Sequence, residues 1–307
     1  MSESLLLLFF NIFVLCMLAL DLGIFQRKAH FPEMKEALTW SVVWIVLSLL
    51  FNLYIWYDFG STKALEFLTG YLVEKALSVD NIFVFIVIFT YFRVPAEYQH
   101  KVLFWGVLGA VLMRAIFIVV GAALVAKFHW LLYIFGVFLI YTAVKLARQK
   151  DEDIHPESNP FLKFCRKLFP ITPDYEESRF FVVKEGRRFA TPLLLVLAVI
   201  ESTDLAFATD SIPAIFAITR DPMIIYTSNI FAILGLRALY FVLANFMKKF
   251  RYLKIGLSLV LGFIGLKMLT ERWFDVPIYY SLAIIFGIIF FSIIFSLRNS
   301  NPRSSSV

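Results

Sequence analysis

Two apolar stretches of this chain carry acidic residues at positions where a membrane span would be expected to hold none. The first, VEKALSVDNIFVFIVIF at residues 73–89, contains Glu74 and Asp80. The second, ESTDLAFATDSIPAIFAI at residues 201–218, contains Glu201, Asp204 and Asp210. A charge at the centre of a bilayer costs about 2.5–3.5 kcal/mol on insertion scales. These carboxylates must therefore face a polar interior, in which they pair with bases, bind a cation or hold protons.

The side chains around these acids offer oxygen ligands. Asn81 and Ser211 each follow an aspartate directly, and neither stretch contains Cys or His. Oxygen donors suit hard or borderline divalent ions such as Mn²⁺, Mg²⁺ and Ca²⁺, whereas Zn²⁺ and Cu⁺ favour His and thiolate ligands. The sequence predicts a metal site formed by Glu74, Asp80, Asn81, Glu201, Asp204 and Asp210.

Basic residues in apolar surroundings allow a competing interpretation, in which the acids form only structural ion pairs. There are five such bases for the five acids: Lys75, Arg114, Lys145, Arg237 and Lys267. Against pure pairing, all five acids cluster on two predicted spans, and most of the bases lie on others. Lys75 is a poor partner for Glu74 because neighbouring residues point about 100° apart on a helix. We expect these bases and Ser211 to surround the site as ion pairs and outer contacts.

The spacing of the acids raises a question about helix geometry. Residues six positions apart, such as Glu74 and Asp80, differ by about 120° on an ideal helix and do not share a face. They can serve one site if the helix is broken between them or if its neighbours approach it from two sides. Pro213 favours a break in the second stretch, because its ring clashes with the carbonyl of Thr209.

Composition requires a membrane protein. Of the 307 residues, 60% are hydrophobic and 17% are charged, and the mean hydropathy is +0.79. Soluble domains of this length need more surface charge. We predict an all-α, polytopic transmembrane bundle. Its nine expected spans, by the length that a bilayer demands, are 4–25, 39–57, 68–92, 102–125, 128–147, 192–219, 223–247, 252–270 and 278–297.

Basic residues are concentrated in every second link between these spans. Links after spans one, three, five and seven, together with the C-terminal tail, hold twenty Lys and Arg, and the opposite links hold four. Because cytoplasmic links are enriched in Lys and Arg, the N-terminus should lie outside and the C-terminus in the cytoplasm. The longest polar link, 148–190, should form a small hairpin around Glu185-Gly186.

An internal repeat relates the two acidic stretches. When Asp80 is aligned with Asp210, Glu74 aligns with Asp204. Further along the chain, LMRAIF at Arg114 resembles GLRALY, and YTAVKL resembles FIGLKML in the same order. Three spans per unit place the second unit in the opposite orientation, as in many secondary transporters. The predicted organisation is a two-span segment (1–66), repeat 1 (67–147), a cytoplasmic loop (148–190), repeat 2 (191–271) and a final span with its tail (272–307).

At EKALSVDN and ESTDLAFATDSIP the sequence resembles the TerC family of bacterial membrane proteins, which includes Alx-type manganese exporters and tellurium-resistance proteins. The resemblance implies two inverted three-span units and Mn²⁺ binding by the five acids of these motifs. It alone supplies manganese by name.

We therefore expect a secondary transporter of the bacterial inner membrane that exports Mn²⁺ or a related divalent cation. Competition between metal and protons for the same acids would couple the two fluxes, and a link to tellurite resistance would be indirect because tellurite is an anion. We expect no enzymatic activity, prosthetic group or nucleic-acid partner; homo-oligomers or membrane partners could form through loop 148–190. The alternative is a membrane scaffold or assembly factor of the TerC type, without transport.

Overall fold

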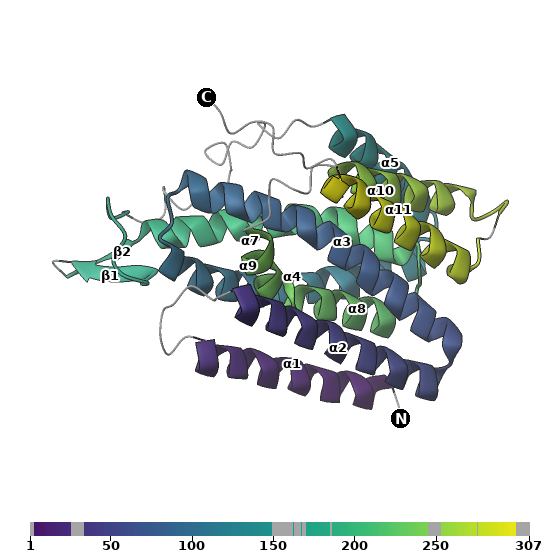
Figure 1. Ribbon diagram of the computed structural model, residues 1–307, viewed down its shortest axis with the longest axis horizontal. Helices are drawn as coiled ribbons and strands as arrows, with labels where there is room; N and C mark the ends of the chain where they lie inside the picture. Colours follow the sequence, from purple (N-terminus) through teal and green to yellow (C-terminus); the bar gives the residue numbers. More distant parts are fainter. Residues whose placement is uncertain are drawn as a thin grey trace.

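Long apolar segments become helices in this chain because a bilayer offers no water to satisfy backbone N–H and C=O groups. The computed structural model describes residues 3–25, 34–148, 162, 167, 170–184, 186–244, 253–274 and 276–298. Their long helices run roughly along one axis (Figure 1). The helices and strands are α1 (Glu3–Phe25), α2 (Met34–Phe59), α3 (Ser61–Tyr91), α4 (Ala96–Lys127), α5 (Leu131–Arg148), β1 (Phe181–Lys184), β2 (Arg187–Ala190), α7 (Pro192–Phe216), α8 (Pro222–Leu234), α9 (Leu236–Ala244), α10 (Leu253–Thr270) and α11 (Ile278–Arg298).

The helices are those of a polytopic membrane protein. Within the described residues, six segments are long and apolar enough to cross a bilayer: α2, α4, α5, α7, the α8–α9 pair and α11. Their outer faces carry exposed apolar side chains, including Leu50 on α2, Val119 on α4 and Phe291 on α11. α3, with 31 residues, is long enough to cross a bilayer, but it is not one of these six because it carries the charged residues of the first acidic stretch.

Two helix interruptions differ from expectation. α7 runs without a break past Pro213, so the prediction that this proline splits the helix is wrong. Pro213 stands three residues before the helix ends at Phe216, so the backbone hydrogen bond that this proline cannot donate belongs to the last turn of α7. The predicted span 223–247 is instead divided at Gly235, between α8 and α9. A Cβ at Gly235 would lie 2.6 Å from Lys75 Nζ and 3.2 Å from Trp44 Cβ, so glycine permits this close approach.

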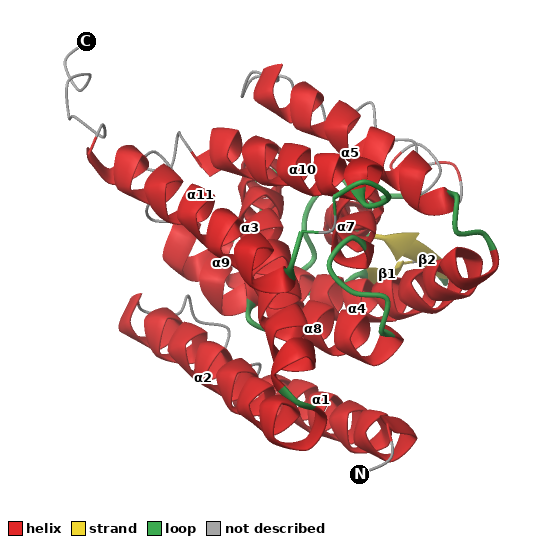
Figure 2. Cartoon of the chain, turned by 90° about the vertical axis from the view of Figure 1, so that its right-hand side faces the viewer, coloured by secondary structure: helices red, strands yellow, loops and turns green. Residues whose placement is uncertain are grey.

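α3 lies between the other helices and packs against α2, α7, α8 and α11. In Figure 2, α1 and α2 lie on one side of the bundle and α5, α10 and α11 on the other. α5 and α10 approach most closely at two glycines: a Cβ on Gly265 would lie 2.8 Å from the carbonyl oxygen of Gly136. Because α3 packs against α2 on one side and α11 on the other, it can contribute residues to a site that both sides of the bundle share.

The predicted hairpin is present. β1 pairs with β2 in antiparallel register, with Lys184 opposite Arg187, and Gly186 takes a positive φ of 75° in the turn. Tyr175 ties the segment to the bundle by donating its hydroxyl to the carbonyl of Phe92, at 2.9 Å. Most of the remaining link between 148 and 170 lies outside the described residues. The hairpin extends beyond the helices at one end of the molecule (Figure 1), called here the hairpin end.

Candidate cation site

Arg114 of α4 joins the two acidic stretches. Its Nη1 donates to Glu74 Oε1 of α3, and its Nη2 and Nε donate to the two carboxylate oxygens of Asp204 on α7, at 3.1 and 3.3 Å. The three side chains are between 0 and 3% exposed. A planar guanidinium can serve two carboxylates at once because its donors point in fixed directions. Two acids that the sequence alignment makes equivalent therefore meet at one base.

Two neutral side chains complete this network. Asn229 of α8 donates its Nδ2 to Glu74 Oε2 at 2.9 Å, and its Oδ1 lies 3.4 Å from Arg114 Nη1. Ser211 of α7 accepts from the same nitrogen at 3.3 Å. Asn229 was not predicted as a site residue, although it is the one amide side chain within the apolar run of α8. Asn229 and Ser211 are 0% and 2% exposed, and they supply hydrogen bonds that the buried charges require.

A cavity of about 340 Å³ lies beside this network, and it is called the acidic cavity below. Asp80 and Asp210 both line it, and Thr142 of α5 donates to Asp210 Oδ1 at 3.0 Å. Its other polar lining residues are Asn81, Tyr141, Lys145, Thr209 and Ser211. One water molecule needs only about 10–15 Å³ of cavity volume. The acidic cavity therefore has room for an ion with several waters.

Ser211 connects the two parts of the site, because it accepts from Arg114 and also lines the acidic cavity. α3 remains continuous between Glu74 and Asp80, which therefore point toward different neighbours. Glu74 faces α4 and α8, and Asp80 faces the cavity beside α5 and α10. Of the two geometries that the sequence left open, the structure adopts the approach from two sides.

The remaining predicted residues lie elsewhere. Glu201 packs its carboxylate against Gly109 of α4, and within the described residues no hydrogen-bond partner reaches its buried Oε2. Lys75 donates to the carbonyl of Ala232, at 3.2 Å. Arg237 lines a small cavity of about 20 Å³ with Glu36 and His100, and Lys267 lines a different cavity at the other end of the bundle. The structure thus divides the predicted set into a buried network, a cavity and separate positions.

Acidic side chains outnumber basic ones in the central region. The network and the cavity together hold four carboxylates (Glu74, Asp80, Asp204 and Asp210) and two bases (Arg114 and Lys145), which gives a formal charge of −2. No three His, Cys, Asp or Glu side chains within the described ranges lie close enough to form a metal cluster. The carboxylates of Asp80 and Asp210 line the cavity together with neutral amide and hydroxyl oxygens.

Comparison with known proteins identifies relatives along nearly the whole chain. Residues 59–304 match the Integral membrane protein TerC family. An uncharacterised membrane protein of Myxococcus xanthus, STKORF319, is 52% identical over 297 residues, covering 97% of this chain and 93% of the relative. The Escherichia coli (strain K12) protein Alx, named as a proposed membrane-bound redox modulator, is 48% identical over 289 residues, covering 91% and 90%.

A Rickettsia bellii membrane protein is 43% identical over 295 residues, covering 96% of this chain and 97% of the relative. No solved structure matches the chain. Since the family match extends over far more than half of the sequence and includes both acidic stretches, the resemblance seen in the motifs is confirmed. The chain belongs to the TerC family of integral membrane proteins.

Proposed function

We propose that this protein is a secondary transporter that exports Mn²⁺, or a related hard divalent cation, and binds it in the acidic cavity. The observation that carries the proposal is that Asp80 and Asp210, from separate acidic stretches, line one cavity beside a buried ion-pair network. The ligands there are carboxylate, amide and hydroxyl oxygens, which suit a hard cation. A divalent ion would neutralise the formal charge of −2 that the cavity and the neighbouring network hold together.

The buried network has a separate role in this proposal. Arg114 already occupies Glu74 and Asp204, so these acids fix the relative positions of α3, α4 and α7 and do not bind the ion directly. Movement of Arg114 on ion binding would reach the cavity through Ser211. Protons that compete for Asp80 and Asp210 would couple export of the metal to entry of protons.

The proposal includes a nine-span topology with two inverted three-span units, in the bacterial inner membrane. Support comes from the pairing of equivalent positions: Glu74 and Asp204 share Arg114, and Asp80 and Asp210 share the cavity. The orientation, with the N-terminus outside and the C-terminus in the cytoplasm, rests on the distribution of Lys and Arg. It places the hairpin end in the cytoplasm.

The test is the manganese content of a host that lacks its own exporters. Cells expressing the wild-type chain should accumulate less manganese than cells with an empty vector, and the D80N and D210N variants should each lose this effect. D58N is the matched control, because Asp58 is an exposed residue that accepts from Tyr54, away from the site. Membrane levels of every variant are measured by immunoblot. Full activity of both site variants at normal membrane levels would refute the proposal.

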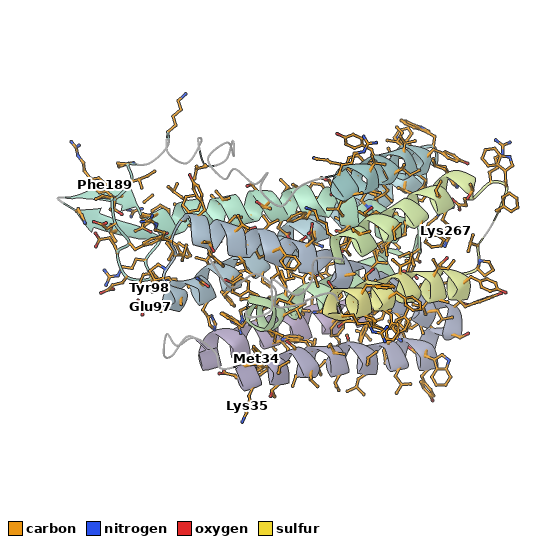
Figure 3. The ribbon with its side chains drawn as sticks, turned by 45° about the horizontal axis from the view of Figure 1, so that its top comes forward. Met34, Lys35, Glu97, Tyr98, Phe189 and Lys267 are labelled. Carbon is orange, nitrogen blue, oxygen red and sulfur yellow. The ribbon has the colours of Figure 1, made fainter. Side chains whose placement is uncertain are left out.

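A scaffold without transport is the second candidate, and the hairpin favours it. Phe181 and Val183 are 48% and 68% exposed on a hairpin that projects beyond the helices, as Figure 3 shows around Phe189. Such a surface could hold a partner protein. A scaffold would tolerate D80N and D210N together and would fail when Phe181 and Val183 are replaced by serine. The same manganese assay with these variants separates the two functions.

A further inference from the structure

A second polar cavity, of about 300 Å³, lies at the opposite end of the bundle from the hairpin. It is lined by Glu66 of α3, Thr219 and Arg220 after α7, and Lys267 of α10, followed by Glu271. Figure 3 shows Lys267 near one end of the molecule and Tyr98 and Phe189 near the other. This far-end cavity has no part in the site described above.

The far-end cavity differs from the acidic cavity in its charge. Glu66 is half-buried and accepts from Thr219 at 2.6 Å, Arg220 pairs with Glu271, and Lys63 pairs with Asp221 at 2.6 Å. With Lys267 these groups number three acids and three bases, so the formal charge is zero. A divalent cation would be attracted much less strongly here than in the acidic cavity, as a release site requires.

An apolar plug separates the two cavities. Leu261 lines the acidic cavity, whereas Leu132, Phe216 and Met268 line the far-end cavity, and all four belong to one buried cluster. From Leu261 to Met268 along α10 the distance is about 10 Å at 1.5 Å per residue. Apolar constrictions block ions because water is excluded from them. The apolar layer formed by these four side chains therefore opposes the passage of a hydrated cation between the cavities.

The plug is also the place where α5 and α10 approach most closely. Gly265 lies between Leu261 and Met268, and a Cβ there would lie 2.8 Å from the carbonyl oxygen of Gly136. The two glycines let the backbones of α5 and α10 pack tightly, so this pair can move as one unit against the rest of the bundle. The start of α5 and the end of α10 line the far-end cavity, and their other halves line the acidic cavity. A tilt of this pair would close one cavity and open the other.

We infer that the far-end cavity is the second mouth of one cation pathway, and that the α5–α10 plug is the gate through which a divalent cation passes from the acidic cavity for release near Glu66. The inference rests on the proposed export function. The zero net charge of the far-end cavity favours release, and the formal charge of −2 held by the acidic cavity together with its neighbouring network favours capture. The single gate prevents a continuous leak.

Cysteine accessibility tests this inference. Cys16 and Cys165 are first replaced by serine, and single cysteines are introduced by T142C in the acidic cavity, K267C in the far-end cavity and I264C in the plug. L259C is the matched control on α10, because Leu259 is 56% exposed on the outer, apolar surface of the bundle. A charged, membrane-impermeant thiol reagent is applied to intact cells and to inverted membrane vesicles, with and without Mn²⁺.

We expect T142C to react only in inverted vesicles, K267C only in intact cells, and L259C in neither. I264C should be protected at rest and should react in intact cells when Mn²⁺ is supplied from the cytoplasm. The inference would be overturned if T142C and K267C reacted from the same side, or if K267C reacted from neither side. It would also be overturned if Mn²⁺ left the protection of I264C unchanged. The sidedness of T142C and K267C needs no transport activity, so that part of the result stands apart from the manganese measurements that test the proposed function.

Discussion

Glu74 and Asp204, 130 residues apart in the sequence, are bound by the same guanidinium, that of Arg114. This places a fixed, fully buried junction between α3, α4 and α7. The acids of the two stretches therefore differ in their surroundings. Arg114 binds Glu74 and Asp204, Asp80 and Asp210 line the acidic cavity, and Glu201 packs against Gly109.

The first prediction concerns this junction. R114M leaves two buried carboxylates without their base, and loss of one partner from a buried ion pair costs about 3–5 kcal/mol. We expect the variant to unfold at markedly lower denaturant concentration in detergent micelles. Adding E74Q to R114M removes one of the stranded charges and should recover part of the loss. Equal stability of R114M and the wild-type chain would contradict the structural role given to Arg114.

Gly109 supports a second prediction. A Cβ on this glycine would overlap the carboxylate of Glu201, so G109A forces Glu201 or the α4–α7 packing to move. Because the overlapping atoms are the end of a flexible side chain that can turn aside, the loss should lie at the lower end of the about 1–3 kcal/mol typical of overpacking. Thermal unfolding in detergent measures it. E201A in the same chain should remove most of it, because the overlapping carboxylate is then absent.

G287A is the matched control for Gly109. Gly287 of α11 has nothing within 4 Å of an added Cβ. Alanine in a helix interior is more favourable than glycine by roughly 0.5–1 kcal/mol, so G287A should leave stability equal or slightly raised. A loss in G287A as large as that in G109A would show that the overlap with Glu201 is not the cause.

A third prediction concerns pH. Burial raises the pKa of Tyr175, in the segment beside the hairpin, to about 12 from a usual value near 10. A group whose pKa is raised on folding stabilises the fold below its unfolded pKa and loses that contribution as pH rises through the folded value. Attachment of this segment should therefore weaken between about pH 10 and 12.

Limited proteolysis of the segment across this pH range measures its attachment. Y175F cannot ionise and should abolish the part of the pH dependence that Tyr175 causes. It also removes the hydrogen bond to the Phe92 carbonyl, at a cost of about 0.5–1.5 kcal/mol at neutral pH. An identical alkaline profile in the wild type and Y175F would exclude Tyr175 as the group responsible.

Much of the fold could be predicted from the sequence, because apolar segment lengths and turn residues are local signals. The hairpin around Gly186 and the membrane-spanning character of the helices follow from them. The break at Gly235 could not be foreseen in the same way. Gly235 is closely approached by Lys75 and Trp44, residues of other helices whose proximity the local sequence does not reveal.

The sequence predicts the chemistry of the candidate site better than it predicts which acids join the buried network and which line the cavity. Acids in apolar surroundings indicate a polar interior wherever they occur, but their sequence positions do not say which of them Arg114 engages. That choice depends on how α4 packs between α3, α7 and α8. Asn229 and Thr142 became members of the site for the same reason, since neither lies in an acidic stretch.

Mn²⁺ binding to the purified protein, measured by calorimetry for the wild type, D80N, D210N and the double variant, tests the central claim most directly. If Asp80 and Asp210 hold one ion together, each single variant binds more weakly and the double variant loses less than the sum of the two. The coupling should be about 0.5–3 kcal/mol, as for residues in direct interaction. Fully additive losses, or wild-type affinity in either single variant, would contradict the shared site.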